Sequence, residues 1–318
     1  MNILKNKNKW LVTGGAGFIG SHLIRDLIRQ NQKVVCVDDF STGSDKNLPE
    51  SQLLEVINSK IQNISLKDLA PDLKGIFHLA AQSSAPKSIE SMYLSSSNNL
   101  LSSLKVWDIA RELSIPIVYA SSSAIYGNLP RGDDKLRKID ILSPYAMDKL
   151  SMENYAKVCW DLYDVSSIGL RFFNVYGPRQ DPLNPYSGVI SIFLDRLLSK
   201  RSVILNGGYQ TRDFIFVRDV SKVLISSMIF SLQNNICSFF NVGTGKSITI
   251  SSLLTEISSI LDIQPKIITK ELPNGDPKVS QCSTVKLEQE MGINTHQFYS
   301  LKKGLKSSIR YIKSLSSQ

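Results

Sequence analysis

A glycine-rich stretch near the N-terminus constrains the fold more than any other feature of this chain. Residues 10–20 read W-L-V-T-G-G-A-G-F-I-G, and the apolar start of this segment is typical of a buried β-strand. Gly14 permits a tight turn, Gly17 lets backbone N–H groups approach a phosphate, and Gly20 lets the following helix pack closely on the strand. A strand, a glycine turn and a helix N-terminus in this order predict a cradle for the pyrophosphate of a dinucleotide.

The next predicted strand supports this interpretation. It covers residues 33–37 and is followed directly by Asp38. A carboxylate at this place can accept hydrogen bonds from both ribose hydroxyls of NAD, so NAD is the expected cofactor. A turn with a purely structural role is the alternative, and the position of Asp38 argues against it.

The first half of the chain continues to alternate short apolar segments with helical patterns. Strands are predicted near 53–57, 76–79 and 116–121, and a long helix over 89–112. This alternation predicts an α/β, Rossmann-type fold with a doubly wound parallel sheet and right-handed crossovers. Ligands of such sheets bind at the carboxyl ends of the strands.

The alternation loosens from about Val175, where prolines and glycines become frequent. We therefore expect an NAD-binding Rossmann domain over 1–174. A smaller C-terminal α/β domain over 175–318 would bind the substrate and return some segments to the first sheet. Its predicted helices cover 189–198, 220–232, 250–261 and 301–312, and its predicted strands cover 203–205 and 214–217.

Composition excludes several classes of protein. With 42% hydrophobic and 20% charged residues, the 318-residue chain is typical of a globular protein with a large core. No apolar run is long enough to cross a membrane, and the polar N-terminus leads straight into the first strand, which predicts no signal peptide. The cysteines lack C-x-x-C spacing, which argues against zinc and predicts free thiols in the cytoplasm: Cys36, Cys159, Cys237 and Cys282.

The net charge of +9 invites the hypothesis of a nucleic-acid partner. The excess is spread thinly, with small clusters over 5–9 and 302–313. The second cluster alternates with Leu301, Leu305, Ile309 and Ile312, as expected of the solvated face of an amphipathic helix. Since no nucleic-acid-binding module is visible, we expect no nucleic-acid partner and no membrane partner.

A tyrosine and a lysine one helical turn apart carry the predicted chemistry. Tyr145 and Lys149 lie in Y-A-M-D-K on a helix that Ser143-Pro144 opens, so both side chains share a face. A tyrosine hydroxyl is a poor base at its ordinary pKa of about 10, so a neighbouring cation must favour the phenolate. Ser122, at the end of a predicted strand, can hydrogen-bond the same substrate oxygen.

With these residues in view, the sequence resembles the extended short-chain dehydrogenase/reductase family, specifically its nucleotide-sugar epimerases and dehydratases. The matching motifs run along nearly the whole chain. They are T-G-G-A-G-F-I-G, D-D-F-S-T-G, H-L-A-A, S-S-S-A-I-Y-G, S-P-Y-A-M-D-K, L-R-F-F-N-V-Y-G-P-R-Q-D-P and T-R-D-F-I-F-V-R-D-V.

The resemblance implies site residues for cofactor and substrate. Besides the three glycines, it assigns NAD contacts to Phe18, Ile19, Asp38, Asp39, Phe40, Ser41, Thr42, Gly43, Ile61, Leu79, Ala80, Ala81, Asn99, Lys149 and Phe173. It assigns contacts to a UDP-sugar substrate to Ser83, Ser84, Ser122, Ser123, Tyr145, Asn174, Gln180, Gly188, Val189, Ile204, Leu205, Asn206, Arg212, Asp276 and Ser280.

Two positions narrow the implied reaction. Dehydratases and decarboxylases of the family usually carry a glutamate where this chain has Ala124, which favours a 4-epimerase. Ser280 stands where enzymes restricted to unacetylated sugars place a tyrosine, which favours UDP-N-acetylglucosamine as the substrate. A UDP-glucose or UDP-uronic acid 4-epimerase is the alternative within the fold. A non-catalytic NAD-binding regulator is the alternative from another class, although such a protein would not need Ser122, Tyr145 and Lys149.

The chain also departs from the family's pattern. Lys60 replaces an aspartate whose carboxylate accepts a hydrogen bond from adenine, and Pro273 replaces an arginine that holds the pyrophosphate. Lys278 is the residue expected to help Arg212 instead. Two helices of the family pair with a second subunit, so we expect a homodimer, with Trp107 and Trp160 as core or dimer contacts.

Overall fold

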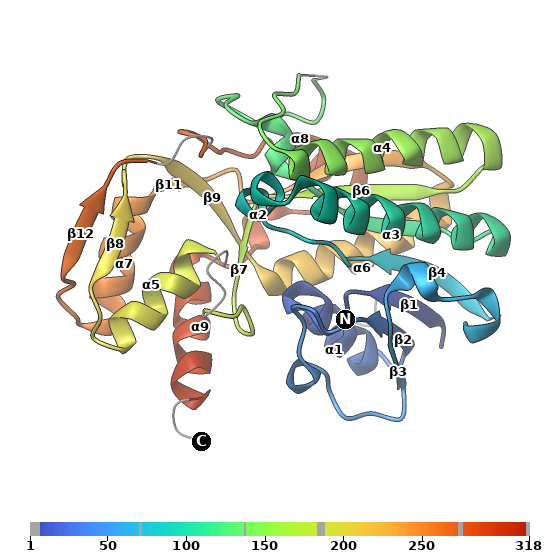
Figure 1. Cartoon of the computed structure of the whole chain (residues 1–318), viewed down its shortest axis with the longest axis horizontal. Helices are drawn as coiled ribbons and strands as arrows, with labels where there is room; N and C mark the ends of the chain where they lie inside the picture. The colour runs from blue at the N-terminus through green and yellow to red at the C-terminus, as the bar shows by residue number, and fades with distance from the viewer. Residues whose placement is uncertain (1–6, 70–71, 137, 183–187, 273–275, 316–318) are drawn as a thin grey trace. The chain divides into compact units, whose positions relative to one another are not determined.

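The computed structural model describes residues 7–69, 72–136, 138–182, 188–272 and 276–315 and divides the chain into two compact units (Figure 1). The first unit contains the chain up to Ile125 together with Ser143–Arg171 and Val220–Phe240. The second unit contains Tyr126–Leu142, Phe172–Asp219 and the chain from Asn241 onward. Neither unit is therefore one continuous segment.

The first unit is built around a seven-stranded sheet. Its strands are β1 (Lys9–Thr13), β2 (Lys33–Asp38), β3 (Leu54–Asn58), β4 (Leu73–His78), β5 (Ile117–Ser122), β6 (Ser167–Phe172) and β10 (Cys237–Val242). They lie in the order β10-β6-β5-β4-β1-β2-β3. β1 pairs in parallel with β2 and β4, β2 with β3, and β4 with β5. This order and direction confirm the predicted Rossmann-type fold.

Helices pack on this sheet and bury its apolar residues. They are α1 (Phe18–Arg29), α2 (Ala85–Glu90), α3 (Met92–Leu113), α4 (Pro144–Tyr163) and α6 (Val217–Asn234), with a short 3₁₀ turn η2 (Ile61–Asn63) after β3. The core includes Leu11, Val35 and Ile76 from the strands. Trp107 from α3 is a core residue, since it is 3% exposed and its ring meets that of Tyr119 edge-on at 5.1 Å.

The predicted long helix over 89–112 is two helices in the structure. Ser91 adopts φ −141° and ψ 64°, so α2 ends there and α3 begins at the next residue. Ser84 caps the start of α2 by accepting the N–H of Lys87, and a proline follows in the first turn. The break was missed because Ser91 is neither glycine nor proline, the residues that usually announce one.

The second unit contains two small sheets and four helices in its described part. Its elements are β7 (Asn174–Tyr176), α5 (Val189–Leu198), β8 (Val203–Asn206), β9 (Thr211–Phe216), β11 (Ser247–Thr249), α7 (Ile250–Leu261), β12 (Ile267–Lys270), α8 (Val285–Met291) and α9 (Leu301–Leu315). One sheet has three strands in the order β11-β9-β7, and the other consists of β8 and β12, which pair in parallel. The core of this unit packs around Tyr176, Phe214 and Phe216.

The described residues contain neither a membrane-spanning helix nor a cluster of metal ligands. None of the helices there is both long and apolar enough to cross a membrane. Nor do three or more His, Cys, Asp or Glu side chains gather there in a way that could hold a metal ion.

Candidate active site

The glycine turn between β1 and α1 has the geometry of an anion cradle. Gly14 has φ +69°, and a Cβ atom on it would lie 2.6 Å from the backbone nitrogen of Ala80. A Cβ on Gly20 would lie 2.2 Å from the carbonyl oxygen of Gly14, so the helix can pack this closely only with glycine. Gly17 is the N-cap and provides no side chain to the first N–H groups of α1, which also has no acidic residue in its first turn. These amides are therefore suited to a pyrophosphate.

Asp38 ends β2 beside this turn. Its carboxylate accepts the backbone N–H groups of Ala16 at 2.8 Å and Phe40 at 2.9 Å. Burial raises the pKa of Asp38, while these amide bonds oppose the rise. Each carboxylate oxygen keeps a second lone pair for a ribose hydroxyl. The arrangement therefore fits the adenosine half of NAD.

The loop after Asp38 wraps around its carboxylate. Phe40 adopts φ +54°, which is unfavourable for a bulky residue and implies that the surrounding structure imposes it. Ser41 donates twice to the Asp39 carboxylate, from its backbone N–H and its hydroxyl. Gly43 passes so close that an added Cβ would lie 3.0 Å from an Asp38 oxygen. Ile61 is buried in η2, whereas Lys60 is exposed beside it.

A chain of hydrogen bonds joins the carboxyl ends of β1 and β4. The Ala80 N–H donates to the Thr13 hydroxyl at 3.3 Å, and Thr13 Oγ1 lies 2.7 Å from Nδ1 of His78. Nε2 of His78 lies 3.2 Å from the Ser103 hydroxyl, which donates to the Asn99 carbonyl at 2.7 Å. Because Ser103 has already donated its proton, Nε2 of His78 carries the imidazole hydrogen. Burial lowers the pKa of His78 to about 3, so the ring is neutral.

The structure brings Ser122, Tyr145 and Lys149 together. Tyr145 and Lys149 lie one turn apart on α4, and a hydrogen bond joins Tyr145 to Ser122 at the end of β5. Nζ of Lys149 lies 5.7 Å from the centroid of the Tyr145 ring and donates to the carbonyl of Ala120 at 2.7 Å. A hydroxyl, a phenol and an ammonium group therefore converge at the carboxyl end of β5.

From the sequence, a neighbouring cation is expected to lower the pKa of Tyr145, but in the structure this pKa is raised. Burial raises the pKa of Tyr145, the bond to Ser122 opposes this rise, and the charge of Asp148 adds to it. Burial lowers the pKa of Lys149 to about 8, and Asp148 opposes that fall. Tyr145 is thus protonated in the protein alone, and its ionisation needs a further positive charge.

Two acidic residues of this site were missed in the sequence. Asp148 lies between the two catalytic candidates on α4, and its carboxylate accepts from the side chain of Asn99 at 2.9 Å. Glu153 forms a buried two-point ion pair with Arg171 and also accepts from the hydroxyl of Ser121 at 2.6 Å. The motif Y-A-M-D-K contains Asp148, so the sequence placed this carboxylate near Tyr145 and Lys149. It did not indicate that Asn99 on α3 would be its hydrogen-bond partner.

Serines of the first unit follow β4 and begin α2. Ser83 is exposed, whereas Ser84 caps α2. Within α2, the Ser88 hydroxyl accepts the backbone N–H of Tyr145 at 3.1 Å. α2 therefore holds one of the otherwise unpaired N–H groups at the start of α4. The other predicted cofactor- and substrate-binding residues of the first unit lie at the ends of its strands and at the start of its first helix. They are Leu79, Ala80 and Ala81 after β4, Ser123 after β5, and Phe18 and Ile19 in α1.

The remaining predicted residues lie in the second unit. Gly188 caps α5, and a Cβ on it would lie 2.8 Å from Nε2 of Gln180, so these two residues are neighbours. Ser280 donates its backbone N–H to the carbonyl of Thr211 at 3.1 Å, which places it beside β9. The others lie along β7, α5 and β8 or next to them: Phe173, Asn174, Val189, Ile204, Leu205 and Asn206.

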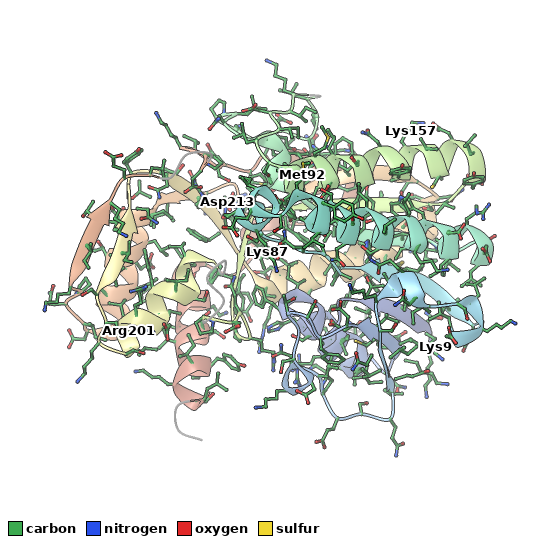
Figure 2. All side chains as sticks on the ribbon, in the orientation of Figure 1. Lys9, Lys87, Met92, Lys157, Arg201 and Asp213 are labelled. Carbon is green, nitrogen blue, oxygen red and sulfur yellow. The ribbon has the colours of Figure 1, made fainter. Side chains whose placement is uncertain are left out.

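Arg212 and Asp276 form an ion pair with each other. Arg212 also donates to the carbonyl of Pro277 at 2.7 Å, and Lys278 is exposed. Asp213, the next residue of β9 (Figure 2), is buried and accepts from Thr244 and from the backbone of the following turn. The substitution at Pro273 lies outside the described residues.

A dinucleotide cradle and a serine–tyrosine–lysine set at the carboxyl ends of one parallel sheet define the class of the protein. It is an enzyme of the short-chain dehydrogenase/reductase type, which works on a substrate hydroxyl with a nicotinamide cofactor. Comparison with known proteins identifies the family more closely.

A model of the NAD dependent epimerase/dehydratase family matches residues 10–243. The UDP-glucose 4-epimerase of Mycolicibacterium smegmatis is 32% identical over 295 residues, covering 89% of this chain and 92% of that protein. The structure of the UDP-N-acetylglucosamine 4-epimerase of Methanobrevibacter ruminantium M1 in complex with UDP-N-acetylmuramic acid has a TM-score of 0.89 and 32% identity, covering 98% and 100% of the chains. That of the Thermotoga maritima UDP-glucose 4-epimerase with UDP-glucose has a TM-score of 0.89 and 29% identity, covering 97% and 99%.

The chain therefore belongs to the NAD dependent epimerase/dehydratase family. The predictions of this family, of an NAD-dependent enzyme and of its fold are confirmed. The roles of individual residues and the identity of the sugar stay predictions.

Proposed function

We propose that this enzyme interconverts the C4 epimers of a UDP-hexose, and that its substrate pair is UDP-N-acetylglucosamine and UDP-N-acetylgalactosamine. The observation that carries the reaction is the convergence of Ser122, Tyr145 and Lys149 at the end of β5. The observation that favours the acetylated sugar is the small residue Ser280 on the edge of β9.

Three residues have separate roles in the proposed proton transfer. Tyr145 takes the proton of the C4 hydroxyl, and Ser122 holds the same oxygen by a hydrogen bond. Lys149 stabilises the phenolate by its charge. NAD, held by the glycine turn and Asp38, would supply the acceptor and donor of the C4 hydride and would not be consumed, because the hydride goes back to the sugar. Tyr145 then gives its proton back to the C4 oxygen.

The alanine at position 124 favours simple epimerisation. Ala124, two residues after Ser122, offers no group for the additional proton transfer of a dehydration or decarboxylation. The backbone N–H of Ala124 donates to the Ser122 hydroxyl at 3.1 Å, which orients that hydroxyl for the substrate oxygen. Since the hydride and the proton both return to the sugar, no other residue is needed.

Gln180 of the second unit offers a hydrogen-bond acceptor to the sugar. The absence of a side chain on Gly188 lets the Gln180 amide lie close to it, and the side-chain carbonyl oxygen of Gln180 is buried and receives no hydrogen bond from the described residues. An acetamido N–H or a sugar hydroxyl would supply the missing donor. UDP-glucose is the second candidate substrate, favoured by relatives that are named for it.

Arg212 is the proposed partner of the diphosphate. Arg212 is already paired with Asp276, so the diphosphate of the substrate would have to share Arg212 with that carboxylate or displace it.

We also propose that the enzyme is a homodimer. Its four free cysteines, Cys36, Cys159, Cys237 and Cys282, support a reducing compartment such as the cytoplasm.

The decisive experiment is to incubate the purified protein with UDP-N-acetylglucosamine and to identify the product by NMR. We expect the C4 epimer, and NAD in the supernatant of heat-treated protein. Added NAD must be tested too, because Lys60 cannot accept a hydrogen bond from adenine. No epimer from any UDP-hexose with NAD present would refute the reaction, whereas turnover of UDP-glucose alone would refute only the choice of sugar.

A further inference from the structure

A buried carboxylate lies within the candidate catalytic group and is not used by the proposed chemistry. Asp148 precedes Lys149 directly and follows Tyr145 by less than one helical turn. Asp148 and Lys149 are each 2% exposed. A buried charge is costly unless other charges or hydrogen bonds compensate for it, so this residue needs a physical explanation.

The partner of Asp148 is a neutral group. Nδ2 of Asn99 donates to its Oδ2 at 2.9 Å, and Asn99 is itself held by Gln82, whose backbone N–H donates to Oδ1 of Asn99 at 2.8 Å. Lys149 does not form an ion pair with Asp148 among the described contacts, since its ammonium donates to the carbonyl of Ala120. The two opposite charges therefore share one interior and interact through space at low dielectric.

The surroundings contain few other charges that could take over this role. On α4, the titratable neighbours are Tyr145 and Lys149, and on β4 it is His78, which is neutral. The packed helix α3 contributes the uncharged Asn99.

The charges described on α2 and further along α4 are exposed or already paired. α2 carries Lys87 and Glu90, and both are exposed. Further along α4, the Glu153 carboxylate is paired with Arg171 of β6. Asp148 is thus the negative charge that acts on the catalytic tyrosine and lysine.

We propose that Asp148 is an electrostatic positioning residue of the active site: its buried negative charge keeps the Lys149 ammonium protonated and holds Tyr145 in the phenol form until further positive charge enters the site. This inference rests on the proposed roles of Tyr145 and Lys149, and it does not depend on which sugar is turned over. The pKa directions agree with it, since Asp148 raises the pKa of both groups.

The charge of Asp148 has a definite consequence for the dependence of activity on pH. The active form requires Tyr145 able to ionise and Lys149 still protonated. Removing the negative charge makes Tyr145 ionise at lower pH and also makes Lys149 lose its proton at lower pH. Both limbs of the pH profile should therefore move toward acid. A purely structural residue would lower the whole profile without moving it.

Asp148→Asn separates charge from hydrogen bonding, because the amide oxygen can still accept from Asn99. Asp148→Ser is a second neutral variant in case the first is unstable. Asp161→Asn is the matched control, since Asp161 lies on the same helix but pairs with Lys157 at its surface. Circular dichroism and thermal melting would establish that each variant is folded.

The first readout needs no substrate and no turnover. Ultraviolet absorbance of tyrosinate is followed as pH rises, and the same titration with Tyr145→Phe added is subtracted to isolate Tyr145. We expect ionisation of Tyr145 to move down by roughly one pH unit in Asp148→Asn, and not at all in Asp161→Asn. A folded Asp148→Asn protein with the Tyr145 titration of the wild type would overturn the proposal.

The second readout is the pH profile of kcat/KM with the sugar that the enzyme turns over. We expect both limbs to move toward acid in Asp148→Asn, so relative activity rises below the wild-type optimum and falls above it. A uniform loss at every pH would assign Asp148 a structural role only and would also overturn the proposal. If no sugar is turned over, the proposed function fails, but the tyrosinate titration still tests the role of Asp148.

Discussion

At the scale of single residues, the candidate chemistry depends on one phenol whose ionisation the protein opposes. Burial and Asp148 both raise the pKa of Tyr145, and only the bond from Ser122 acts the other way. This is useful for an enzyme that must both remove and return the same proton, because a permanently ionised tyrosine could not act as the acid.

We expect Tyr145→Phe to lower turnover by several orders of magnitude and to leave NAD bound. The phenol oxygen is the only proton acceptor of the proposed set, whereas the ring can pack as before. Epimerisation rate and NAD content per chain are measured on the same preparation. Activity near the wild-type value would remove Tyr145 from the mechanism, and loss of NAD would mean that the ring contributes to cofactor binding.

Ser280 provides the prediction about specificity. If Ser280 borders the sugar as proposed, a tyrosine in its place would take up the volume that the acetamido group needs, so Ser280→Tyr should suppress turnover of UDP-N-acetylglucosamine far more than turnover of UDP-glucose. Because a missing or clashing group in a hydrogen-bonding site changes discrimination by orders of magnitude, the ratio of the two kcat/KM values is the quantity to measure. An unchanged ratio would show that Ser280 does not select the sugar.

At the scale of elements, α3 and α4 present an exposed apolar surface. The two helices pack side by side (Figure 1), and their outer faces carry Leu94 and Leu101 on α3 and Val158 and Leu162 on α4. These side chains are 69%, 54%, 47% and 66% exposed, respectively. Exposed apolar side chains gathered on neighbouring helices are typical of protein interfaces. A second copy of the chain is the occupant expected from the family.

The double substitution Leu101→Glu and Val158→Glu should therefore yield a monomer. Two buried carboxylates per chain at a helix–helix interface would be unpaired, which is strongly unfavourable. Size-exclusion chromatography with light scattering measures the mass of wild type and variant. Ile267→Glu on β12 is the control, since Ile267 is 47% exposed elsewhere and its substitution should leave the mass unchanged. A wild-type monomer, or a variant that stays dimeric, would contradict the prediction.

At the scale of the whole molecule, stability should depend on pH through His78. Its pKa is about 3 in the folded protein and about 6.5 in an unfolded chain. The folded-state pKa is depressed, so the stabilisation is present above pH 6.5 and is lost as pH falls toward 3. The unfolded chain takes up a proton in this window and the folded protein does not, which costs up to ~1.4 kcal/mol per pH unit.

Urea unfolding measured at several pH values tests this expectation. Between pH 6.5 and 5, where most carboxylates are still ionised, the free energy of unfolding should fall as pH decreases. The variant His78→Gln cannot take up a proton, so its slope in this range should be smaller than that of the wild type. Equal slopes would mean that His78 does not dominate acid destabilisation.

The sequence by itself determined the elements whose signals are local. The glycine spacing, the apolar strand before it and Asp38 after the next strand lie within a few tens of residues, and each acts through its own backbone geometry. Tyr145 and Lys149 share a face because the helical repeat places them there. The helices α5 and α7 have the predicted bounds for the same reason.

Only the tertiary structure decided the contacts between residues that are far apart in the chain. Asp148 meets Asn99 across 49 positions, Arg212 meets Asp276 across 64, and the ring of His78 meets Thr13 across 65. No periodicity or motif predicts such pairs, because they depend on which helix packs against which strand end. These pairings also set the burial that shifts the pKa values of Tyr145, Lys149 and His78, and burial is a property of the folded chain alone.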